Sequence, residues 1–77
     1  MEYEITVDEN VSSSKDKPTF DVDLVAWDRF GGGMKHSRGF GITKTEAQTV
    51  VKKQARLYNA YVTYKTPEIE KFYQGGE

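Results

Sequence analysis

The sequence contains no cysteine, a single histidine and only two prolines in 77 residues. Without cysteine the chain has neither disulfides nor thiolate metal ligands, two devices that commonly stabilise chains of this length. It also has no run near the roughly 20 apolar residues that a membrane-spanning helix needs, and its charged N-terminal segment lacks the apolar core of a signal peptide. We therefore expect a cytoplasmic protein with no membrane partner.

Residues suited to catalysis are equally scarce. A lone histidine, His36, is more often a surface or packing residue than a catalyst, and the glycines at 31–33 lack the Lys-Ser/Thr ending of a phosphate-binding loop. The carboxylates of the first half lack the tight spacing of a calcium loop and are typical of a solvated face: Glu2, Glu4, Asp8, Asp21 and Asp23. The sequence predicts a binding protein, not an enzyme, with no cofactor and no metal site.

A strong charge asymmetry lies behind the overall net charge of −1. Residues 1–28 hold eight acidic and two basic side chains, a net charge of −6, whereas residues 29–66 hold eight basic and one acidic, a net charge of +7. Such segregation is typical of a protein with an anionic partner. The alternative is that acidic strands neutralise a basic helix within the fold.

Three segments, 2–9, 19–28 and 35–42, have the period-2 alternation of β-strands. The polar segment 10–18 and the glycine-rich segment 29–34 are predicted to connect them. Trp27, on the outer side of the second strand, is either partly exposed or covered by another element. We expect the inward-facing side chains to form the sheet side of the core: Tyr3, Ile5, Val7, Phe20, Val22, Leu24, Phe40 and Ile42.

A helix is predicted over residues 44–59. Thr43 and Glu46 have the spacing of a capping box, in which each side chain bonds the backbone N–H of the other residue. The helix has an apolar face that should pack on the sheet, with Ala47, Val50, Val51 and Tyr58, and a basic face opposite.

The segment 61–74 is too apolar for a free tail. Residues 61–64 either continue the helix or form a short strand, and Thr66-Pro67 predicts the start of another helix. The predicted fold is α+β, a three-stranded antiparallel sheet packed against one amphipathic helix, with the C-terminal segment, as a short strand or helix, covering the core.

The chain length supports a single domain, residues 1–77. We expect its core at 2–66, a short helix at 67–74 and a frayed end at 75–77. A second copy of the chain could replace the C-terminal segment as the cover of the core, but we favour a monomer over a homodimer.

Seven basic residues beside the glycine-rich turn and along the helix form a candidate nucleic-acid site. Flexible backbone amides and a helix N-terminus next to basic side chains make a place for phosphate. The residues are Lys35, His36, Arg38, Lys44, Lys52, Lys53 and Arg56. A solubilising helix face is the alternative interpretation.

Residues 3–7, 18–24 and 39–47 follow one another as strand, strand, and strand with helix start. This order resembles the C-terminal portion of the double-stranded-RNA-binding domain over roughly residues 2–57. That family opens its second helix with Ser-Lys-Lys-x-Ala-Lys, of which only the first lysine is matched, by Lys44, while Thr45 and Gln48 stand at the others. The family's first helix and the minor-groove contact of its loop have no counterpart, so the resemblance implies the fold more than RNA binding.

The Lys-containing third strand and the Thr-x-x-Glu-Ala helix start are also similar to the arm-site DNA-binding domains of phage-type integrases, which read DNA with the sheet. We expect a small non-enzymatic nucleic-acid-binding protein that contacts duplex phosphates through its basic strand and helix. The alternative is a protein-binding module, such as a phage or mobile-element inhibitor or regulator of a host protein, because aromatic residues favour interfaces. Its candidate interface residues are Trp27, Tyr61, Tyr64, Phe72 and Tyr73.

Overall fold

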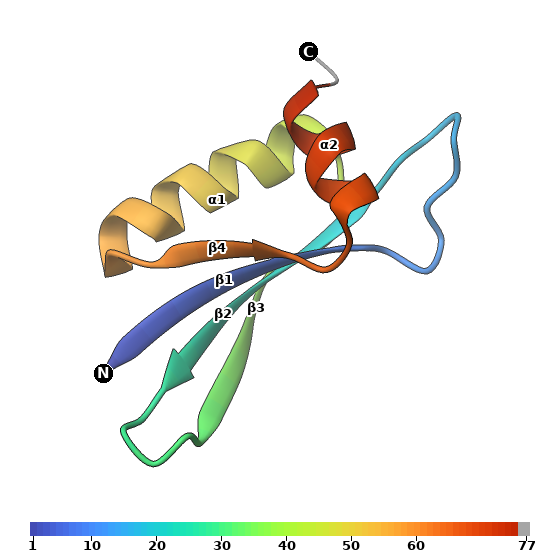
Figure 1. Ribbon diagram of the computed structural model, residues 1–77. Coiled ribbons are helices and arrows are strands. Elements are labelled where there is room, and N and C mark those ends of the chain that lie inside the picture. Colours follow the sequence, from blue (N-terminus) through green and yellow to red (C-terminus); the bar gives the residue numbers. More distant parts are fainter. Residues whose placement is uncertain (76–77) are drawn as a thin grey trace.

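Apolar alternation in the first half of the chain produces three strands, and the second half adds two helices and a short fourth strand (Figure 1). The computed structural model describes residues 1–75, with side chains through Lys71. The strands are β1 (Glu2–Glu9), β2 (Phe20–Trp27), β3 (Gly33–Ile42) and β4 (Tyr61–Tyr64), and the helices are α1 (Lys44–Tyr58) and α2 (Pro67–Gly75). The α+β class, the three predicted strands and the main helix are confirmed.

The sheet is mixed, with the strand order β3-β2-β1-β4. β1 and β2 pair antiparallel along their whole length, from Glu2 opposite Trp27 to Glu9 opposite Phe20. β4 lies parallel to β1 at one edge. The predicted three-stranded antiparallel sheet is therefore corrected to four strands with one parallel pair. The reason is that α1 carries the chain back along the sheet, so the strand after it runs in the direction of β1.

The core lies between the sheet and the two helices. Its buried apolar side chains are Ile5, Val7, Phe20, Val22, Leu24, Ala47, Val51 and Ile69, and Tyr3, Ile42, Val50 and Tyr58 pack against them while partly buried. The rings of Tyr3 and Tyr58 lie 4.9 Å apart between centroids and join β1 to the last turn of α1. This confirms the predicted core with one exception.

Phe40 is that exception, because 74% of its surface is exposed. β3 pairs with β2 through an irregular register that places Gly39 and Ile42 opposite buried residues of β2. An irregularity of this kind shifts every following side chain, so Gly39 and not Phe40 faces the helices. A Cβ at position 39 would come within 2.5 Å of Cδ1 at the tip of the Ile42 side chain, which would have to rotate away.

α1 begins at the predicted capping box. Thr43 Oγ1 accepts the N–H of Glu46 at 3.2 Å, and Glu46 Oε1 accepts the N–H of Thr43 at 3.0 Å. The backbone hydrogen bond from Thr43, followed by the one from its hydroxyl, lowers the pKa of the Glu46 carboxyl. The helix ends at Tyr58, and the left-handed backbone of Asn59 (φ 52°) turns the chain so that the Ala60 N–H donates a 3.0 Å bond to the Ala55 carbonyl.

The C-terminal segment covers the core of its own chain, and residues 61–64 form a strand rather than the end of α1. Thr66 Oγ1 accepts the N–H of Ile69 at 3.1 Å, and the Ile69 side chain is buried in the core beneath α2. Gly75, expected in the frayed end, is the last residue of α2. Residues 76–77 and the side chains of Phe72 and Tyr73 lie outside the described part.

Both helices lie on the same side of the sheet, so in the described chain the opposite side carries neither (Figure 1). We call this second side the bare face. It is formed by the alternate residues of β1 and β2 that point away from the core, with their neighbours on β3 and β4. Neither described helix is long and apolar enough to cross a membrane.

Candidate functional site

The outer face of α1 carries the most closely grouped basic side chains. Lys52, Lys53 and Arg56 are exposed, and their spacing of three and four residues puts them on the helix face turned away from the sheet. With Thr49 and Leu57 they line a shallow hollow of about 430 Å³. Within residues 1–75, none of the three basic groups forms an ion pair. We call Lys52, Lys53 and Arg56 the basic face of α1.

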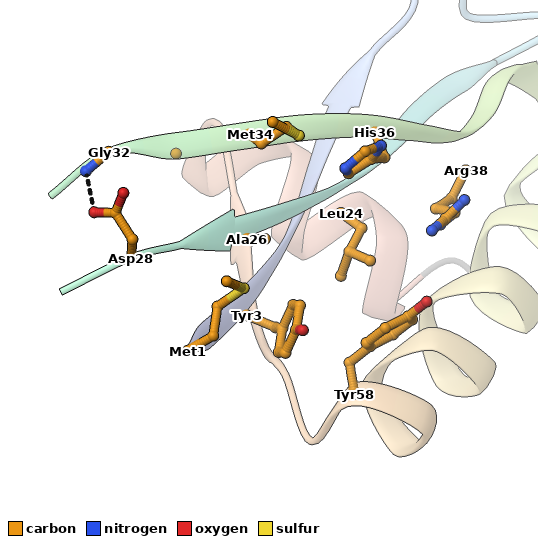
Figure 2. A pocket seen from close by; sticks show the side chains of 11 residues that line it. Met1, Tyr3, Leu24, Ala26, Asp28, Gly32, Met34, His36, Arg38 and Tyr58 are labelled. Carbon is orange, nitrogen blue, oxygen red and sulfur yellow. Dashed lines mark hydrogen bonds between the residues drawn. The ribbon is translucent and has the colours of Figure 1, made fainter. Parts of the chain in front are cut away.

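His36 and Arg38 lie in a groove between β3 and the last turn of α1 (Figure 2). The groove has a volume of about 490 Å³, and Tyr3 and Tyr58 contribute to its lining from β1 and α1. Tyr58 directly follows Leu57, which borders the hollow on α1. The groove and the hollow on α1 thus both reach the last turn of the helix, where Tyr58 lines the first and Leu57 the second.

Lys35 and Lys44 do not join these groups. Lys35 points to the bare face, where its Nζ lies 3.9 Å from Oδ2 of Asp23. Lys44 opens α1, but its side chain is half-buried and already interacts within the protein. Of the seven predicted nucleic-acid contacts, the structure thus brings together three on α1 and two in the groove, and it places two elsewhere. Lys44 is also the only lysine that matches the helix motif of the double-stranded-RNA-binding domain.

Two of the predicted protein-interface residues, Trp27 and Tyr61, come together on the bare face. Glu4 lies between them: it stands opposite Tyr61 in the parallel pair, and its Oε1 accepts a 2.9 Å hydrogen bond from Trp27 Nε1. Trp27 is partly exposed, the first of the two alternatives for this residue. Tyr64 instead packs against the core from β4. The side chains of the other two candidates, at 72 and 73, are not among those described.

The two sides of the molecule carry opposite charge. The bare face gathers five carboxylates and two lysines: Glu2, Glu4, Asp8, Asp21, Asp23, Lys35 and Lys65. Lys35 and Asp23, on neighbouring strands of this face, form an ion pair. The acidic residues of β1 and β2 that point outward lie on the opposite side of the sheet from α1.

The bare face perturbs the ionisation of one exposed side chain. Partial desolvation raises the pKa of the Tyr61 phenol, and the negative charges of Glu4 and then Glu2 raise it further. A charged phenolate is disfavoured there for both reasons. The tyrosine is therefore a neutral hydroxyl beside two carboxylates at physiological pH.

Clustered metal-ligand side chains and the single histidine are the features that bear on metal binding and catalysis. No three His, Asp or Glu side chains in this part come close enough to hold a metal ion. His36 lies in the groove beside Arg38 and apolar side chains. The absence of enzymatic activity stays a prediction.

Sequence reasoning missed the groove and the hydrogen bond between Trp27 and Glu4. The alternation of β1 and β2 places both residues on the outer side, which is the signal that was available. Which outer residues meet depends on the register between strands, and a local pattern does not set it. Tyr61 lies beside Glu4 only because β4 pairs with β1.

Comparisons with protein-family models, with curated proteins and with solved structures each found no match to this chain.

Proposed function

We propose that this chain is a small nucleic-acid-binding protein that contacts duplex phosphates through the basic face of α1. The observation that carries the proposal is the position of Lys52, Lys53 and Arg56, which are exposed, share one face and form no ion pair among the described residues. Their charges are thus available to an anionic partner. Phosphate is the partner that suits them, since lysine and arginine bind it through charge-assisted hydrogen bonds.

The distribution of acidic groups supports the same orientation. Five carboxylates lie on the bare face, on the other side of the sheet from α1. A duplex lying along α1 is therefore kept away from these five of the twelve acidic side chains. Arg38 and His36, in the groove at the last turn of the helix, extend the basic surface toward β3.

The resemblance to the double-stranded-RNA-binding domain supports the proposal only in outline. In that family the helix after the third strand carries the basic motif at its start, where this chain has the half-buried Lys44. The basic face of α1 begins two turns later, at Lys52. The proposal therefore depends on the basic face itself, and both duplex DNA and duplex RNA are suitable probes.

The test is fluorescence anisotropy with labelled DNA and RNA duplexes of about 20 base pairs, beginning near 50 mM salt. Three phosphate contacts on B-DNA predict a log–log salt slope of about −2.7, so affinity should fall about 40-fold between 50 and 200 mM salt. Replacing Lys52, Lys53 and Arg56 together by glutamate should weaken binding ~10-fold or more near 50 mM salt.

A matched control changes the same charge elsewhere. Lys15, Lys17 and Lys71 are exposed in the 10–18 loop and on α2, and their joint replacement by glutamate alters the net charge by the same amount. This control should retain most of the affinity. Undetectable binding of both duplexes near 50 mM salt, or equal loss in the two triple variants, would refute the proposal.

A further inference from the structure

The bare face is the side of the sheet that neither helix covers (Figure 1). At one end of this face, aromatic and acidic side chains come from three strands: Trp27 from β2, Glu4 from β1 and Tyr61 from β4. Tyr61 is 48% exposed and Trp27 is partly exposed. Large aromatic side chains that are partly exposed and held by neighbouring groups are typical of the anchors of protein interfaces.

The hydrogen bond from Trp27 to Glu4 holds this aromatic end of the bare face in place. The Nε1 donor and the Oε1 acceptor are 2.9 Å apart, and the bond links β2 to β1 on the outer side. Glu2 stands opposite Trp27 in the same strand pair. The rings of Trp27 and Tyr61 are thus bordered by the carboxylates of Glu2 and Glu4.

Several carboxylates of this face already have partners, and others do not. Asp21 accepts hydrogen bonds from Asn10 and from the N–H of Gly41, and Asp23 is paired with Lys35. Glu2 and Glu4 lie away from these contacts, at the aromatic end of the face. In the described chain neither of them forms an ion pair. Lys35 and Lys65 line the hollow that also holds Glu4 and Trp27. With five carboxylates and two lysines, the bare face still has a negative net charge.

Two carboxylates beside two aromatic rings are complementary to a cationic side chain. The carboxylates attract the charge, and the face of a tryptophan or tyrosine ring adds a cation–π contact, which is strongest for tryptophan. Nucleic acid would be repelled by the same carboxylates. A second copy that presented its own bare face would bring carboxylates against carboxylates. A basic protein segment meets neither obstacle.

We infer that the aromatic end of the bare face is a docking surface for a lysine- or arginine-rich segment of a partner protein. Trp27 and Tyr61 contact the cationic side chains of that segment, and Glu2 and Glu4 balance their charge. This surface lies across the sheet from α1, so the inference is independent of the nucleic-acid proposal. With both surfaces occupied, the basic face of α1 and the aromatic end of the bare face, the protein links a nucleic acid to a basic partner protein.

The test titrates the isotope-labelled full chain with octa-arginine and, separately, with octa-glutamate as the opposite-charge probe. Trp27 is the only tryptophan, so its fluorescence reports on this face directly. Octa-arginine should change the Trp27 emission and shift the backbone amide signals of β1, β2 and β4 in NMR spectra. Octa-glutamate should leave both unchanged.

The decisive variant replaces Glu2 and Glu4 together by glutamine, which keeps an acceptor for the Trp27 N–H. Its matched control replaces Glu68 and Glu70, exposed on α2, by glutamine. The first pair should lower the affinity for octa-arginine by roughly 2- to 30-fold relative to the second, the range expected from two exposed charge pairs.

Three outcomes would overturn the inference. One is equal affinity of the two double variants for octa-arginine. Another is that a DNA duplex shifts the same amides of β1, β2 and β4, which would make nucleic acid the occupant. The third is that these amides shift on simple dilution of the protein, which would make the occupant a second copy.

Discussion

The two faces of the sheet are made by the same strands but differ in every physical property. In β1, Ile5 is fully buried beneath the helices, whereas its neighbour Glu4 stands on the bare face among charged and aromatic groups. One face is apolar and covered by the helices, whereas the other carries most of the charged side chains of β1 and β2 and no helix, with Val25 and Thr6 as its buried residues. The difference teaches that the stability of this small protein depends mostly on one set of alternate residues, which leaves the other set free for interactions.

The first prediction concerns the covered face, the side of the sheet that packs against the helices. Replacing Ile5 by alanine should lower the free energy of unfolding by about 2–5 kcal/mol, because it leaves a cavity among fully packed side chains. Replacing Glu2 on the bare face of the same strand by alanine should change it by no more than about 0.5 kcal/mol. Urea denaturation followed by circular dichroism measures both. A similar loss of unfolding free energy in the two variants would mean that the covered face does not contribute more to stability than the bare face.

The second prediction tests how far the covered face depends on the C-terminal segment. Ile69 is the side chain that α2 buries in the core. Its replacement by alanine should lower the free energy of unfolding by about 2 kcal/mol, near the smaller end of the range for such changes, because α2 lies at the end of the sheet. Thermal unfolding at two protein concentrations about tenfold apart should give the same midpoint if the cover is intramolecular.

The exposed neighbour Glu68 supplies the control for Ile69. Its replacement by alanine should leave the unfolding midpoint almost unchanged, since the side chain is on the solvent side of α2. An unchanged midpoint in the Ile69→Ala variant would show that α2 is not part of the core. A midpoint that rises with concentration in the unmodified chain would instead point to a homodimer.

The third prediction has the smallest expected effect and concerns α1, which covers one face and carries the basic residues. Replacing Thr43 by alanine removes one side of the capping box and should cost about 1 kcal/mol of stability. Replacing Thr45, the exposed second residue of α1, by alanine should be neutral or slightly stabilising because alanine favours helices. Equal effects of the two changes would mean that the cap does not stabilise α1.

The partner of Thr43 in the cap gives the same prediction a pH dependence. The pKa of Glu46 is lower in the folded protein than its ordinary value, so its charged form stabilises the fold above that ordinary pKa. This contribution is lost as the pH falls through the lowered pKa. The stability difference between the unmodified chain and Glu46→Gln should therefore shrink on acidification below the ordinary carboxyl range. A difference that stays constant with pH would contradict the charged cap.

The sequence by itself determined the local structure. Period-2 alternation defined β1, β2 and most of β3, and the Thr43–Glu46 capping box defined the start of α1, because each signal depends on neighbouring residues alone. It also determined most of the core, since Ile5, Val22 and the other inward residues follow from these periods. It identified the charge asymmetry between the two halves of the chain.

Tertiary structure decided which side chains from distant segments lie together. The pairing of β4 with β1 made the sheet mixed, and the irregular register of β3 moved Phe40 out of the core. The same pairings divided seven basic residues among separate surfaces and placed Trp27, Glu4 and Tyr61 together. The physical reason is that a register is chosen by non-local packing, and a shift of a single residue turns a side chain to the opposite face of the sheet.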